Sequence, residues 1–264
     1  MKRLILLLVS VIIIYAFVGV VAKTFGNRET INSMAETFMT HVYNFEFDTA
    51  RKDIKKIEAK FKGHPFVLFA ELLVDWINYT EGGDKSLFNH KQFTRKVKSA
   101  RDYTKEWVKK NRYDPNGYLI LGGIYGLKGN YELLVHDFIA AYFDGKSAVK
   151  YMHKAIELKP DFYDAYFGIG LFEYYTATLP SVVKVLSMFI STGDAQKGFD
   201  QIMLVKEKGC FAKQTAALVL IRIHLDEKSP FFDVEKAKQL IKEFKKDHPN
   251  YPESNFTIID KYNL

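Results

Sequence analysis

The chain has 264 residues, enough for one sizeable domain or two small ones, and 48% of them are apolar and 26% charged. This balance is typical of a folded globule and excludes a wholly disordered chain. A formal net charge of +7 is mild and does not by itself indicate nucleic-acid binding. The single cysteine, Cys210, excludes an internal disulfide framework and a cysteine-based metal cluster.

An uncharged, mostly apolar run over residues 4–22 follows Lys2 and Arg3. Nineteen residues of helix span about 28 Å, close to the hydrocarbon thickness of a bilayer. The run predicts a membrane-targeting segment, either an uncleaved signal-anchor or a signal peptide cleaved after Ala22, with a buried core helix as the remaining alternative. Because a positive flank tends to stay in the cytoplasm, we expect the rest of the chain on the extracytoplasmic, periplasmic side, anchored or secreted.

Residues 145–175 show the pattern of two packed helices. Ala148, Met152 and Ala155 lie four and three apart on one helical face, where the two small residues allow a neighbouring helix to approach. Pro160 cannot continue this helix, so the chain turns there. The next helix carries an aromatic, an aliphatic residue, a glycine and a second aromatic at helical spacing: Tyr166, Ile169, Gly170 and Tyr174.

Similar patterns recur along the chain. The aromatic–aliphatic–glycine–aromatic pattern, typical of the first helix of a repeat, recurs at Tyr118, Leu121, Gly122 and Tyr125. The pattern of the second helix, with its closing proline, recurs at Ala237, Ile241, Phe244 and Pro249. A fainter copy of it lies at Ala50, Ile54, Ile57 and Pro65. This succession resembles the tetratricopeptide repeat, in which a bulky aromatic, Leu-Gly and Tyr are followed by Ala, Phe and Pro.

The whole chain resembles a group of bacterial tetratricopeptide proteins with a membrane-targeting N-terminus. More distantly, it is similar to eukaryotic helical-repeat proteins through residues 164–175 and the Leu-Pro pair at 179–180. Glu173 departs from the repeat pattern, which prefers tyrosine at that position. The resemblance implies an all-α fold, an irregular α-solenoid of antiparallel helix pairs after the N-terminal transmembrane or signal helix.

The expected organisation is a targeting segment over 1–22, a short linker over 23–30, a helical repeat domain over 31–258 and a tail over 259–264. We expect ten or eleven helices in the repeat domain. They include a long basic helix over 86–110 and an apolar helix that opens at Pro180 and ends near 192. About 14 extra residues between Tyr125 and Ala148 predict one hairpin that is lengthened or carries an inserted turn.

In a solenoid of this kind, the first helices of successive pairs line an inner surface that usually holds a peptide or a partner helix. Helical phase selects four candidate groove residues: Asn116, Asp164, Phe167 and Tyr174. For Phe167 and Tyr174, packing in the core is the competing interpretation. The sequence therefore predicts a non-enzymatic protein-interaction scaffold of the cell envelope, which binds a protein or peptide partner.

Enzyme motifs are absent from the sequence: it has no Gly-rich phosphate loop, no Gly-x-Ser-x-Gly elbow and no His-Glu-x-x-His. We expect no cofactor and no metal, since the His136-Asp137 pair has only His153 as a nearby further ligand. The alternative function is an envelope hydrolase in which Glu173, set among tyrosines, has a raised pKa. Cys210 has no His–Asn arrangement nearby to activate it, and we interpret it as a packing residue.

Residues 91–112 carry nine Lys or Arg against Asp102 and Glu106. Four interpretations compete: a solvated helix face, contact with anionic lipid, contact with an acidic partner, and nucleic acid. We expect no nucleic acid, because the chain is predicted to leave the cytoplasm. An apolar stripe at helical spacing predicts that the segment packs one face on the body: Phe93, Val97, Ala100, Tyr103 and Trp107.

Overall fold

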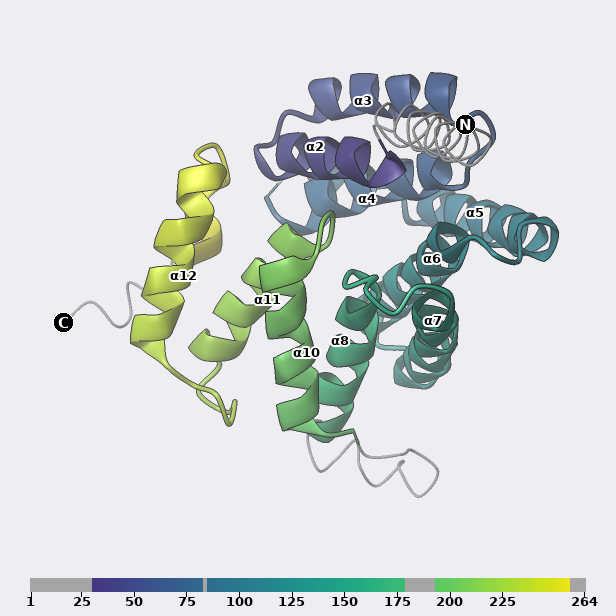
Figure 1. Ribbon diagram of the computed structural model, residues 1–264. Helices are drawn as coiled ribbons and strands as arrows, with labels where there is room; N and C mark the ends of the chain where they lie inside the picture. Colours follow the sequence, from purple (N-terminus) through teal and green to yellow (C-terminus); the bar gives the residue numbers. More distant parts are fainter. Residues whose placement is uncertain (1–29, 83–84, 179–192, 257–264) are drawn as a thin grey trace, which may run out of the picture.

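The computed structural model describes residues 30–82, 85–178 and 193–256, and this part of the chain is all-α. It holds ten α-helices, in line with the expected number, and a short 3-10 turn at Lys85–Leu87 (Figure 1). The helices are α2 (Ile31–Tyr43), α3 (Phe47–Lys60), α4 (Phe66–Thr80), α5 (His90–Lys110), α6 (Pro115–Leu134), α7 (Phe138–Leu158), α8 (Ala165–Thr178), α10 (Ala195–Lys208), α11 (Lys213–Leu225) and α12 (Val234–Asp247).

Short polar residues cap six of these helices. In each case an Asp, Asn or Thr side chain accepts a hydrogen bond from a backbone N–H in the first turn, which stabilises the helix start by about 1 kcal/mol. The capping residues of α2, α5, α6, α7, α10 and α12 are Thr30, Asn89, Asp114, Asp137, Asp194 and Asp233. Helix positions in this chain are therefore set largely by local chemistry.

Consecutive helices pack in pairs because small residues allow close approach. A Cβ placed on Gly122 of α6 would lie 3.1 Å from the carbonyl oxygen of Ala148 and from Met152, both in α7. A Cβ on Gly170 of α8 would lie 2.9 Å from the carbonyl oxygen of Gly198 in α10. These contacts confirm the packing positions predicted for α6, α7 and α8.

The hairpin of α6 and α7 is lengthened in both helices, which have 20 and 21 residues, whereas α2, α3 and α4 have 13 to 15. The extra residues predicted between Tyr125 and Ala148 belong to these two long helices and to the turn that joins them. They meet at a tight turn over 135–137, where His136 has a positive φ of 62°. Of the two possibilities left by the sequence, lengthening is the one observed.

Helix α11 lies in the interior of the array, and eight of its 13 residues are buried. A helix that is apolar all round belongs in a core. The Tyr43 hydroxyl of α2 lies 2.8 Å from that of Thr215 in α11, and Arg222 of α11 donates to both carboxylate oxygens of Glu81, at 2.8 and 2.6 Å. In Figure 1, α11 lies between α10 and α12, beneath α2, and it contacts all three. The last pair thus folds back onto the first pair.

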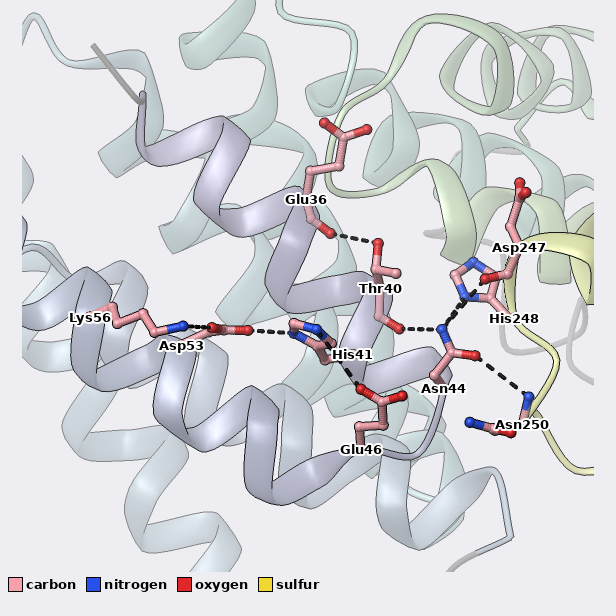
Figure 2. Close-up of polar contacts among 10 residues, drawn as sticks. All are labelled: Glu36, Thr40, His41, Asn44, Glu46, Asp53, Lys56, Asp247, His248 and Asn250. Carbon is pink, nitrogen blue, oxygen red and sulfur yellow. Dashed lines mark hydrogen bonds and ion pairs between the residues drawn. The ribbon is translucent and has the colours of Figure 1, made fainter. Parts of the chain in front are cut away.

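Polar contacts hold α2 from two sides (Figure 2). Asn44, directly after α2, donates to the carbonyl oxygen of Asp247 at 3.4 Å, and its amide nitrogen lies 3.5 Å from Nδ1 of His248, after α12. Toward α3, Nδ1 of His41 lies 2.5 Å from the Asp53 carboxylate. Helix α2 and the residue that follows it therefore bond both α3 and the end of α12.

Several expectations concern residues outside the described ranges. They are the targeting segment 4–22, nearly all of the linker 23–30, the helix opening at Pro180, and the tail 259–264. Within the ranges that the structure describes, no helix combines the length and the apolar character needed to cross a bilayer.

Candidate functional site

Asp164, predicted to line the groove, is only 3% exposed. Its Oδ1 accepts hydrogen bonds from the backbone N–H groups of Cys210 at 3.0 Å and Ala212 at 2.9 Å, which lead into α11. Burial raises the pKa of this carboxyl group, against the lowering effect of the two hydrogen bonds. Its observed contacts fix the start of α11, and contact of Asp164 with a partner stays a prediction.

Tyr174 and Phe167 of α8 also face the interior. Tyr174 is 2% exposed, and its hydroxyl donates to Oγ of Ser229, in the loop after α11, at 2.9 Å. Burial raises the pKa of this phenol. Phe167 is partly buried against the main core cluster. Core packing, the competing interpretation, accounts for both aromatic residues, because α11 and the loop that follows it fill the space expected for a partner.

Asn116 lies in the first turn of α6, whereas the other three candidates lie in α8 or directly before it. Its side-chain amide donates to the capping carboxylate of Asp114 at 3.2 Å. It is half-buried, and contact of Asn116 with a partner stays a prediction. Asp164 and Tyr174 are thus buried and Phe167 and Asn116 partly buried, and a groove formed by the four stays a prediction.

Glu173, the residue of the hydrolase alternative, is engaged through both carboxylate oxygens. Oε1 accepts from Nζ of Lys197 at 2.7 Å, and Oε2 accepts from the backbone N–H of Asp194 at 3.1 Å. Beside these partners is a shallow hollow of about 430 Å³ between α8 and α10. It is lined by mostly polar side chains: Tyr166, Asp194, Gln196, Lys197, Asp200, Gln201 and Leu204. Glu173 is not among the lining residues, and Tyr166 is the one aromatic residue of this hollow.

The other candidate chemical groups serve local structure. Asp137 is the N-cap of α7 and accepts from Ala140, while His153 is exposed on the same helix. Among the described residues, no group of three His, Cys, Asp or Glu is placed to hold a metal ion. Cys210 is half-buried, and burial raises the pKa of its thiol, which disfavours the reactive thiolate.

The turn between α6 and α7 carries a group of exposed apolar side chains that we call the apolar tip. Its six members are 41–63% exposed: Leu133, Leu134, Val135, Phe138, Ile139 and Phe143. Between the first and the last of them, His136 and Asp137 are the only His, Asp, Glu, Lys or Arg residues. The sequence signal was the run LLVHDFIAAYF, apolar on every helical face, which the repeat pattern did not use. Large exposed apolar groups that adjoin one another usually mark an interaction surface.

A cluster of charged residues joins α6 to α7 just behind the apolar tip. Nζ of Lys128 bonds the carboxylates of Glu132 and Asp144, and Oε2 of Glu132 is buried without a hydrogen-bond partner in the described structure. Burial and the neighbouring Asp144 raise the pKa of Glu132 to about 7. The two carboxylates and the shared ammonium tie the ends of the long hairpin together, so the apolar tip stands on a fixed base.

Helix α5 carries the basic segment, and most of its predicted stripe is confirmed. Phe93, Val97 and Ala100 are buried, and Trp107 is partly buried. Tyr103 differs, since its side chain is 45% exposed and the buried position is Thr104. The segment is therefore a helix that packs one face on the body, as the stripe predicted.

Neither the known protein-family models nor the curated proteins include a match to this chain.

Proposed function

We propose that the chain is a non-enzymatic protein-interaction scaffold and that a partner protein docks on the apolar tip. The observation that carries this proposal is the gathering of six large, exposed apolar side chains on one turn, although the inner face of the array is filled by α11. A surface of this composition needs an apolar counterpart, such as one face of a partner helix. The ion-paired base of the tip favours binding, because little order has to be gained on association.

Two sequence features support the wider setting of this proposal. The signatures at 118–125 and 237–249 favour membership of the tetratricopeptide class, whose arrays assemble other proteins. The apolar run at 4–22 favours a scaffold held at a membrane, on its extracytoplasmic side. The partner surface would then be displayed by a long hairpin of a membrane-associated helical array.

A photo-crosslinking amino acid at position 139, in the full chain in intact cells, tests the docking surface. We expect a discrete protein adduct from Ile139 and none from the matched control at Tyr113, which is 78% exposed but lies outside the apolar tip. The adduct should be lost with Leu134→Ser and Phe138→Ser, while the thermal midpoint changes little, since exposed substitutions cost about 0.5 kcal/mol or less. Equal adducts from both positions, or none from Ile139, would contradict the proposal.

A further inference from the structure

Helices α3 and α5 lie next to each other on the outside of the array. The Asp75 carboxylate of α4 lies between them, 3.6 Å from the guanidinium of Arg51 in α3 and 2.6 Å from Nζ of Lys96 in α5. Further along, the Tyr103 hydroxyl of α5 donates to the carbonyl oxygen of Gly63, just after α3, at 2.7 Å. The earlier residue of α3, Arg51, faces the earlier residue of α5, Lys96, and the later Gly63 faces the later Tyr103. The two helices therefore run in the same direction.

These two neighbouring helices concentrate the positive charge of the protein. Residues 47–62 and 90–112 hold fifteen of the 38 Lys and Arg residues but only five of the 31 Asp and Glu. Because the whole chain has a net charge of +7, the remainder of the chain is net negative. The basic segment identified in the sequence is therefore half of a larger feature, which the helix packing completes with α3.

Six cations on these helices are exposed and have no carboxylate ion pair in the part of the chain that the structure describes. Two of them, Lys91 and Lys110, lie at the two ends of α5. The other four are Lys52 and Lys55 of α3 and Arg95 and Lys98 of α5, and we call them the basic face. Other cations of the two helices are already engaged: Lys56 bonds Asp53, and Lys109 bonds Glu106. The basic face is thus unpaired positive charge that is available to an anionic partner.

We propose that the basic face docks on the surface of an anionic lipid bilayer. Lys and Arg side chains near such a surface each contribute about fivefold to binding, and this attraction is lost at high salt. The position in the chain favours a bilayer over other polyanions, because α2 and α3 are the first helices after the apolar run 4–22. The seven residues 23–29 reach at most about 25 Å, which keeps this end of the body close to any membrane that the run enters.

The test uses the full chain with Cys210→Ser and an environment-sensitive fluorophore attached through Ser99→Cys, an exposed, uncharged site on α5 beside Lys98. Vesicles of phosphatidylcholine alone are compared with vesicles that also contain phosphatidylglycerol. We expect a blue shift of the emission only with the anionic vesicles, reversed by about 1 M salt, at which the screening length falls to about 3 Å.

Neutralising the basic face with K52Q, K55Q, R95Q and K98Q should weaken this response by several hundredfold, or about fivefold for each cation. The matched control removes four exposed cations from the last helix pair and the loop within it, through K228Q, K236Q, K242Q and K246Q, and should keep the response. Equal blue shifts with neutral and anionic vesicles would overturn the proposal, as would equal losses in the two variants. A shift with duplex RNA but not with anionic vesicles would assign the basic face to nucleic acid instead.

Discussion

At Glu132, burial and the nearby Asp144 carboxylate disfavour the ionised form, so the folded-state pKa rises from 4.5 to about 7. The folded chain then binds more protons at this site than the unfolded chain between these two values. The resulting stability is fully present below about pH 4.5 and is lost as the pH rises through 7. Lys128 offsets part of the loss, because it bonds both carboxylates.

Glu132→Gln removes the titrating group. As the pH rises from 4.5 to 8, the unfolding free energy of the parent chain should therefore fall relative to that of the variant. We expect a relative gain on the order of 1 kcal/mol, reduced by solvent screening of a cluster that is partly exposed. Urea melts at both pH values measure this change. The exposed Glu235→Gln is the control, and an identical pH dependence of E132Q and the parent chain would refute the assignment.

Glu81 joins three parts of the chain that are distant in sequence. Its carboxylate accepts two hydrogen bonds from Arg222 and one from the Tyr251 hydroxyl, at 2.5 Å, while Asn255 donates to its backbone carbonyl at 2.6 Å. Burial and the nearby carboxylate raise the pKa of Tyr251, so the phenol keeps its proton and donates. No local sequence pattern marks this network.

We expect Glu81→Gln to cost about 2 kcal/mol of unfolding free energy. This is less than is typical for a broken buried ion pair, because the Arg222 side chain is 54% exposed. Tyr251→Phe removes one hydrogen bond to the same carboxylate, so the two substitutions should be less than additive by about 0.5 kcal/mol or more. A double-mutant cycle in urea measures the coupling, and strict additivity would show that the network does not act as a unit.

At the scale of the helix, the glycines of this chain differ sharply in what surrounds them. A Cβ on Gly170 would lie 2.9 Å from the carbonyl oxygen of Gly198 and 3.0 Å from Ile202, whereas a Cβ on Gly126 would meet only Ala148, at 4.0 Å. Gly170→Ala should therefore destabilise the fold by about 1–3 kcal/mol through overpacking. Gly126→Ala should stabilise it by about 0.5–1 kcal/mol, because alanine favours the helix.

Thermal or urea melts of these two variants check the α8–α10 seam directly. Opposite signs of the change in unfolding free energy are the expected result. If both alanines stabilise the chain, then α8 and α10 are further apart than the structure places them, and the pairing at Gly170 and Gly198 is wrong.

The sequence could predict the helices and their paired contacts because caps, prolines and small residues act within a few positions of one another. Pro160, Gly122 and Gly170 are examples. It could not predict how the array closes, because the contacts responsible join distant residues, as Tyr43 joins Thr215 across 172 positions. The burial of the groove candidates Asp164 and Tyr174 could not be predicted for the same reason: helical phase gives the face of α8 but not the element that covers it.

At the scale of the whole molecule, the position of α11 separates this chain from an open solenoid. In an open array each pair contacts only its neighbours, and the terminal pair unfolds most easily. Here the last pair contributes α11 to the main core cluster, together with residues of α2, α4 and α8. The chain should consequently unfold as one cooperative unit, with its last pair as stable as its first.

Native-state amide hydrogen exchange of α11, compared with α2 and α4, tests this closure most directly. The central residues of α11, from Leu218 to Ile223, should exchange only through global unfolding, with the same free energy of opening as the buried parts of α2 and α4. In an array that ends in an open, fraying pair, α11 and α12 would instead exchange together, with an opening free energy several kcal/mol lower than that of the other helices. That result would contradict the closed arrangement.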